Sequence, residues 1–514
     1  MEGISGLFQK EDGMMDMDKD KIRAMFSKSD WNHETIEVAN DIIEKIATEW
    51  LGLSIYPNQF EITTSEQMLD AYSLIGLPIS YNHWKFGKDF VMNQNNYKKG
   101  RMGLAYELVI NSNPCISYNM EDNTTCLMTL VLAHAAMGHN HFFKNNYLFK
   151  QWTQADSIVD YMVFARDYIH KCEEKYGFEE VEQVLDACHA LMNYGVDKYK
   201  KPRRISAVEE QERLRKRLED DRILLNDLWR TVPKDEKERM KEKRFPESPE
   251  ENILYFIEKN SPKLRGWQRE IVRIVRKTAQ YFYPQGQTKV INEGCATHTH
   301  YEIINRMYEE GYLAEDFMLE FYHHHSNVIM QPSFDSQYYS GLNPYTLGFN
   351  IFQDLKRMSL NPTKEDINWF PDIAGKGDWI EQFGYIVENF KDETFVLQYL
   401  SPKVIRDMKL FRIDDQAENS YYEVAAIHNE AGYKKVRQAL SEHYNRCRYV
   451  PDIQVYDVDV YGDRTLTLEY TPENGKGLSY GDVKKVVPYV EFLWGFPVKM
   501  TESGKDIYST KKSV

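Results

Sequence analysis

The sequence of 514 residues predicts a mainly α-helical large domain with a small β element, followed by a smaller α+β domain at the C-terminus. Two patterns predict the helical part. Apolar residues recur at three- and four-residue spacing from Ile36 to Leu51, and the run from Thr125 to Met137 is apolar nearly all round. β-branched and aromatic runs after about Pro402 alternate with helical segments and predict the α+β domain. A zincin-like packing of the helices is one option for the large domain.

The segment 103–118 (GLAYELVINSNPCISY) supplies the predicted β element. Its apolar run Leu108–Ile110 is stopped by Asn-Ser-Asn-Pro, which predicts a strand, a turn and a second short strand. The polar triplet 122–124 then offers an N-cap for the apolar helix. Because that helix has almost no polar face, we expect it to be buried.

Changes in composition along the chain predict the domain limits. Residues 1–29 are polar and predict a flexible acidic tail before the helical domain, which covers 30–400. Within that domain, residues 205–244 are dense in charged side chains, which is typical of a solvated helical insertion; a partner-docking arm is the alternative. Residues 361–377 predict a loop. Residues 401–514 show a β-β-α-β-β-α-β order without an evident catalytic cluster.

Composition and charge argue against several classes of protein. The net charge of −15 disfavours broad nucleic-acid binding, which needs a cationic surface, and the arginines at 269, 273 and 276 make only a weak case for it. No run approaches about 18 apolar residues, so no membrane span is predicted. The N-terminus lacks the apolar core of a signal peptide. Six cysteines without a CxxC pair fit a reducing compartment, and we expect a soluble cytoplasmic protein.

Histidines give the main indication of chemistry, because they gather in the windows 131–144, 290–301 and 321–331. His134 lies on the apolar helix, where an imidazole needs a partner for each nitrogen. The metallopeptidase motif HExxH is absent, since Ala135 and Gly138 stand in place of its Glu and second His. On an α-helix, His134 and His139 would lie about 140° apart. We therefore predict that Gly138 ends the helix in a left-handed cap and lets the two imidazoles converge.

Glu293 is the third predicted metal ligand. In the segment NEGCA, Asn292 can cap a new helix with Glu293 in its first turn, and a plain capping carboxylate is the alternative. His300 lies on nearly the same helical face but roughly 10 Å further on, so one ion cannot take both side chains directly. We assign His300 to a supporting or acid role.

The third window contains His323, His324 and His325, which cannot share one face of a helix, and we expect His323 or His325 to point inward. The ligand set predicts a divalent metal ion, zinc in first place, that lowers the pKa of a bound water. Such chemistry needs a general base, and Glu107 on the predicted strand is the candidate.

Several long segments closely resemble the SpoVR (stage V sporulation protein R) family, in the stress-operon branch of non-sporulating bacteria. Among them are 103–115 (GLAYELVINSNPC), 138–149 (GHNHFFKNNYLF), 266–285 (GWQREIVRIVRKTAQYFYPQ) and 341–357 (GLNPYTLGFNIFQDLKR). The resemblance runs from about Trp31 to about Met500. It implies a link to sporulation, spore cortex formation and stress responses, and the family's motifs carry over onto His134, His139, Glu293 and His300.

The resemblance also implies partners and shows two departures. Family members are encoded beside a PrkA-type serine kinase and a companion with a von Willebrand A-like region. Cys295 stands where the NEG motif is usually followed by Trp, and His298 replaces an aromatic residue. These departures indicate a changed pocket shape or an additional soft ligand pair.

Two functions follow as hypotheses. The first is a metal-dependent, zinc-type hydrolase that acts on a peptidoglycan-related or peptide-like substrate. The second is a non-catalytic regulator or scaffold in a PrkA-type kinase pathway, which the charged segment 205–244 and the C-terminal domain favour. Loss of function in His134→Ala would support the first hypothesis.

Overall fold

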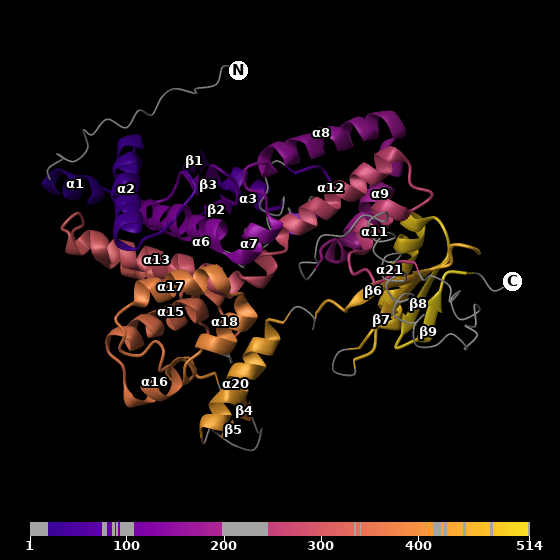
Figure 1. The fold of residues 1–514 in the computed structure, drawn as a ribbon. Coiled ribbons are helices and arrows are strands. Elements are labelled where there is room, and N and C mark those ends of the chain that lie inside the picture. Colours follow the sequence, from indigo (N-terminus) through magenta and orange to yellow (C-terminus); the bar gives the residue numbers. More distant parts are fainter. Residues whose placement is uncertain are drawn as a thin grey trace, which may run out of the picture. The chain divides into compact units, whose positions relative to one another are not determined.

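The chain forms two compact units in the computed structural model (Figure 1). Unit 1 comprises Met1–Lys171 and Tyr281–Arg446, and unit 2 comprises Cys172–Gln280 and Cys447–Val514. The structure describes residues 19–73, 80–84, 88, 91–92, 107–197, 245–333, 336–339, 341–410, 412–414, 423–425, 429–445, 449–472 and 476–511. The charged segment 205–244 lies outside these residues, so its two interpretations stay predictions.

Unit 1 is mainly helical, which confirms the predicted fold class of the large domain. Its central helix is α13, whose residues Ile291, Ile303 and Met307 are fully buried in the main hydrophobic core. The N-terminal helices and turns of the unit are α1 (Lys19–Phe26), α2 (His33–Lys45), η2 (Ile46–Trp50), α3 (Ser65–Ser73), α5 (Thr125–Val131), η3 (Leu132–His139), α6 (Asn140–Asn145) and α7 (Tyr147–Trp152). The later ones are η6 (Gln285–Gln287), α13 (Lys289–Glu309), α14 (Glu315–Val328), α15 (Pro344–Leu360), α16 (Lys364–Trp369), α17 (Trp379–Asn389), α18 (Asp392–Tyr399), α19 (Pro402–Asp407) and α20 (Glu430–His443).

A three-stranded sheet lies beside the apolar helix of unit 1. Its order is β1 (Asn58–Thr63), β3 (Cys115–Met120) and β2 (Glu107–Ile110), with β1 parallel and β2 antiparallel to β3. The predicted strand-turn-strand over 103–118 therefore forms as β2 and β3. In this register the first residue of β2, Glu107, is opposite Asn119.

Two segments of unit 1 are more ordered than their composition predicts. Residues 19–26 were assigned to the flexible tail but form α1, because Ile22 and Phe26 are spaced one turn apart and are both buried. Part of the predicted loop 361–377 forms α16. Its N-cap Thr363 and Asp366 make a reciprocal capping box, which satisfies the free N–H groups of a short helix.

Unit 2 contains a four-stranded sheet and helices. The sheet order is β6 (Ile453–Val458), β7 (Leu466–Tyr470), β8 (Val498–Glu502) and β9 (Lys505–Ser509). Helix α21 (Tyr480–Trp494) connects the parallel strands β7 and β8. The other elements that lie wholly in this unit are α9 (Phe178–Ala190), η4 (Met192–Tyr194) and α11 (Ile253–Asn260), while α8 (Ile158–Tyr176) and α12 (Gly266–Phe282) contain the points where the chain passes between units.

The smaller α+β part confirms the second half of the predicted fold class, but its limits differ from the predicted boundary at residue 401. Strands β4 (Arg412–Asp414) and β5 (Glu423–Ala425) form a separate pair, and α20 belongs to unit 1. The reason is local contact, since Ser441 of α20 donates a hydrogen bond to the carbonyl of Glu393 at α18. Residues 172–280 group instead with the C-terminal strands.

The arginine face of α12 makes ion pairs within unit 2. Arg273 and Arg276 both lie within 3.1 Å of carboxylate oxygens of Glu258, and Arg269 donates to the carbonyls of Glu258 and Ser261. These three arginines are therefore engaged within the unit, which weakens the case for their contact with a phosphate backbone. No helix in the described ranges is long and apolar enough to cross a membrane.

Candidate metal centre

His134 and His139 lie on one continuous helical segment that changes its turn in the middle. Thr124 caps α5 by accepting a hydrogen bond from the N–H of Leu127, and η3 and α6 continue the segment to Asn145. In η3 the hydrogen bonds span five residues, as in the bond from the N–H of Asn140 to the carbonyl of Ala135. Residues five apart therefore lie above one another, and the two imidazole centroids are 4.7 Å apart.

The convergence of the two histidines was predicted, but the predicted cause was wrong. Gly138 does not end the helix in a left-handed cap; the helix runs through it, and its φ is not positive. A glycine is needed here for close packing, because a Cβ at position 138 would lie 2.5 Å from the Cα of Ala296 in α13. The π turn, which no spacing rule for α-helices includes, brings His139 beneath His134.

A second close contact, between Gly294 and Gly348, lets α13 pack against α15. A Cβ on Gly294 would lie 2.5 Å from the Cα of Gly348, so neither position accepts a larger residue without a backbone shift. Helix α13 thus lies against η3 through Ala296 and against α15 through Gly294. This close packing brings Glu293 and His300 of α13 up to the histidines of η3.

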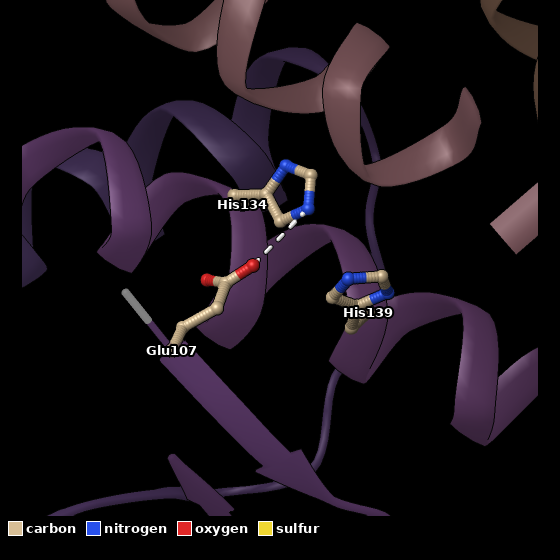
Figure 2. Close-up of side chains that lie close together, drawn as sticks. All are labelled: Glu107, His134 and His139. Carbon is tan, nitrogen blue, oxygen red and sulfur yellow. Dashed lines mark ion pairs between the residues drawn. The ribbon is translucent and has the colours of Figure 1, made fainter. Parts of the chain in front are cut away.

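Glu107, His134 and His139 form a group that could hold a metal ion (Figure 2). Each residue offers one ligand atom, and these atoms all lie within 4.8 Å of one another. Figure 2 shows Glu107 reaching up from β2 toward His134, and its Oε1 is 3.2 Å from Nε2 of His134. The predicted general base Glu107 therefore lies among the predicted ligands.

Glu293 approaches the same histidines from α13. Its Oε2 is 3.4 Å from Nε2 of His139 and 3.8 Å from Nε2 of His134. The predicted N-terminus at Asn292 is wrong, because α13 begins at Lys289 and Asp392 accepts hydrogen bonds from the N–H groups of its first turn. Asn292 is free to bind Nδ1 of His139 instead, with its Oδ1 at 2.9 Å.

The bond between His139 and Asn292 selects the nitrogen that can bind an ion. An amide oxygen only accepts hydrogen bonds, so Nδ1 of His139 carries a proton and Nε2 faces Glu293. Sequence reasoning missed this role. The signal that could have found it is the position of an amide next to a candidate ligand in the chain.

The carboxylates are buried and incompletely paired. Oε2 of Glu107 and Oε2 of Glu293 have no hydrogen-bond partner among the residues that the structure describes. Burial raises the pKa of Glu107, and the neighbouring histidines only partly oppose it. Burial also acts to raise the pKa of Glu293, but His139 and His134 outweigh it and lower that pKa. For His139, burial is outweighed by Glu293, and the pKa rises to about 9.

Two further histidines form a row behind His134. Nδ1 of His134 lies 2.9 Å from Nδ1 of His300, and Nε2 of His300 lies 2.8 Å from Nδ1 of His325. All three rings are buried. His300 thus contacts a candidate ligand from behind rather than lining a cleft. His325 is the inward residue of its triplet, whereas His323 is exposed.

The two departures from the family motif lie away from the candidate centre. The thiol of Cys295 is directed at the carbonyl of Gly138, at 3.9 Å. His298 lies 3.1 Å from the side-chain nitrogen of Gln353, and its ring stacks on Phe352. Burial lowers the pKa of His298 to about 4. The two residues have separate surroundings, which gives no support to a soft ligand pair.

The candidate centre lies at a cleft of about 940 Å³ in unit 1. One part of its wall is apolar, with Leu108, Val109, Leu127, Leu130, Val131, Phe143, Phe282, Val328 and Tyr345. The polar part consists of Glu107, His134, His139, Asn292, Glu293, Gln285, Lys289, His324 and Asn327. Lys289 is exposed and lies one helical turn before Glu293, about 6 Å along α13. Convergent polar groups beside an apolar wall are typical of ligand sites.

Comparisons with known proteins agree along the chain. The family model described as SpoVR like protein matches residues 30–449, and that of the SpoVR-like C-terminal domain matches residues 451–505. The chain is similar to the uncharacterized protein YcgB of Escherichia coli (strain K12), with 53% identity over 492 residues that cover 95% of this chain and 96% of that protein. No solved structure matches the chain.

Proposed function

This chain belongs to the SpoVR family, and we propose that it is a metal-dependent hydrolase with a peptide-like substrate. The observation that carries the proposal is the convergence of two imidazoles and two carboxylates from β2, η3 and α13 at one cleft. Two His and a carboxylate are the donor set of many catalytic zinc sites.

The residues present fit a divalent ion. Buried polar atoms in proteins are normally hydrogen-bonded, and a buried carboxylate oxygen without a partner is costly. Among the described residues, Oε2 of Glu107 is one such oxygen, and Oε2 of Glu293 also lacks a hydrogen bond and has only ion-pair contacts with the two imidazoles. An ion there would supply a Lewis acid that activates water and polarises a carbonyl. We assign Glu107, His134 and His139 as its ligands, because one donor atom of each residue lies within 4.8 Å of the donor atoms of the other two.

The remaining carboxylate, Glu293, is suited to accept a proton. It lines the cleft, and its Oε2 lies within 4 Å of both imidazoles. A general base must lie within reach of the group that it deprotonates, and this position meets that condition. The proposal thus exchanges the roles that the sequence suggested for the two carboxylates, and it assigns His300 a positioning role.

Features of the cleft support the substrate class. An apolar wall suits a side chain or an acyl group, while Lys289 offers a cation one turn from Glu293 for a carboxylate of the substrate. Both features fit peptide-like compounds, including the stem peptides of peptidoglycan that the family's link to spore cortex suggests.

Metal analysis tests the centre. We expect about one equivalent of zinc or iron in the purified protein and less than about 0.1 equivalent in His134→Ala and His139→Ala, since each variant removes one ligand. An unchanged metal content in both variants would contradict the proposed metal centre. His141→Asn is the matched control, because His141 is equally buried on the same helical segment but bonds to Ser54.

Hydrolysis is tested separately. The metal-loaded protein is incubated with peptidoglycan stem peptides and a mixed peptide library, and products are followed by mass spectrometry. We expect Glu293→Gln to retain the ion but to lose hydrolysis by about 10²-fold or more. If wild type and Glu293→Gln leave both substrate sets equally intact, the ion serves another purpose, and the scaffold hypothesis gains support.

A further inference from the structure

The row His134–His300–His325 connects the candidate metal centre to two further buried histidines of unit 1. His300 is fully buried, and His325 is 4% exposed. Nδ1 of His300 lies 2.9 Å from Nδ1 of His134, and Nε2 of His300 lies 2.8 Å from Nδ1 of His325. Both are hydrogen-bond distances. A neutral imidazole has one N–H and one acceptor nitrogen, so the direction of each bond in the row depends on its neighbour.

Without an ion, the carboxylates set this direction. Oε1 of Glu107 and Oε2 of Glu293 lie 3.2 and 3.8 Å from Nε2 of His134 and favour a proton on that nitrogen. Nδ1 of His134 then accepts from Nδ1–H of His300. Nε2 of His300 in turn accepts from Nδ1–H of His325.

With an ion on Nε2 of His134, the direction of both hydrogen bonds in the row must reverse. The proton of His134 then lies on Nδ1, which donates to Nδ1 of His300. His300 carries its proton on Nε2 and donates to Nδ1 of His325, whose own proton lies on Nε2. The row keeps three protons throughout, because Nε2 of His134 releases one and Nε2 of His325 takes one up.

We infer that His300 and His325 are positioning residues that hold the ring of His134 and report occupancy of the candidate metal centre by a concerted change of tautomer. The inference rests on the proposed function only for the presence of an ion. His139 differs, since its partner Asn292 offers an oxygen that can only accept and keeps a proton on Nδ1 of His139 in both states.

Solid-state ¹⁵N NMR of histidine-labelled protein tests the change of tautomer directly, with zinc as the probe ion. We expect His300 and His325 to move their protons from Nδ1 to Nε2 on addition of one equivalent of zinc. Difference spectra with His300→Asn and His325→Asn assign the signals. If zinc binds and both residues keep their tautomers, the inference is overturned.

Metal affinity provides the second measurement, by chelator competition on the full chain. Loss of a partner that orients a ligand typically costs about 10- to 100-fold in metal affinity, and we expect this for His300→Phe. His325→Phe leaves His300 in place and should weaken binding less. The control is His298→Phe, which lies on the same helix and is equally buried but outside the row. Equal affinities in His300→Phe, His325→Phe and the control would overturn the positioning role.

The failure of this inference is distinguishable from that of the proposed function. A protein that binds zinc and shows the tautomer change but hydrolyses nothing would refute the hydrolase alone. A hydrolase whose metal affinity is unchanged by substitution of His300 and His325 would refute only the positioning role of these two residues. A protein that binds no ion would refute both.

Discussion

Gly138→Ala should separate the two helices that build the candidate centre. The added Cβ would lie 2.5 Å from the Cα and 2.9 Å from the Cβ of Ala296, whereas ordinary contacts begin at 3.4 Å. Both neighbouring atoms are fixed to the backbone of α13, so no side-chain rotation relieves the overlap. Helix segment η3 must therefore move by about 0.9 Å relative to α13.

The energetic cost follows from two opposing effects. Overpacking of a well-packed core costs about 1–3 kcal/mol, and replacing glycine by alanine inside a helix returns about 0.5–1 kcal/mol. We expect a net loss of about 1–2 kcal/mol in the free energy of unfolding of unit 1. The control is Gly384→Ala in α17, where a Cβ would meet nothing within 4 Å, and which should stabilise by about 0.5–1 kcal/mol.

Urea unfolding followed by tryptophan fluorescence measures the two variants, first in the presence of a chelator so that no ion contributes. Zinc competition then measures the centre, where a shift of this size exceeds the tolerance of about 0.2 Å for ligand distances, and we expect at least a tenfold loss of affinity. If Gly138→Ala is as stable as Gly384→Ala and binds zinc like the wild type, the close packing of η3 on α13 does not position the histidines.

Three further predictions concern the surroundings of the centre. Asn292→Ala should weaken zinc binding by about 10- to 100-fold in chelator competition while Asn292→Asp retains it, because only an acceptor fixes the tautomer of His139. Burial lowers the pKa of three histidines to about 4 in the folded state: His141, His298 and His325. The unfolded chain therefore binds their protons first, and these three groups together lower the free energy of unfolding by about 4 kcal/mol for each pH unit below 6.5; in urea titrations His298→Phe should remove about 1.4 kcal/mol per pH unit of this loss. Burial raises the pKa of Asp392 to about 7, so its contribution has the opposite sign and is lost as the pH rises from 4 to 7; Asp392→Asn removes this opposing contribution and should steepen the loss of stability on acidification by about 1.4 kcal/mol per pH unit between pH 5 and 6.

Periodicity predicted many of the elements of the fold but not all of them. The alternation of β-branched runs and helices after residue 400 predicted β4 to β8 in their observed order and missed β9, since each of the predicted elements carries its own local pattern. The limits of the units were harder to predict, because residues 172–280 join strands that lie some 200 residues later. No local pattern in either segment encodes that pairing, and it depends on packing between distant parts of the chain.

The candidate site shows which kind of information a spacing rule omits. His134 and His139 are five residues apart, which separates two side chains on an α-helix and aligns them on a π turn. A search for ligand pairs at i and i+4 therefore rejects the pair, although its two ring centroids lie 4.7 Å apart. A π turn is less favourable than a regular α-helical turn, so it persists only where the surrounding packing stabilises it. Here η3 is fully buried and lies against α13 at a glycine that admits no Cβ. A polar pair at five-residue spacing on an all-apolar helix, with a glycine beside one member, is thus the pattern from which the sequence predicted the convergence of His134 and His139, and the π turn is the geometry that the prediction lacked.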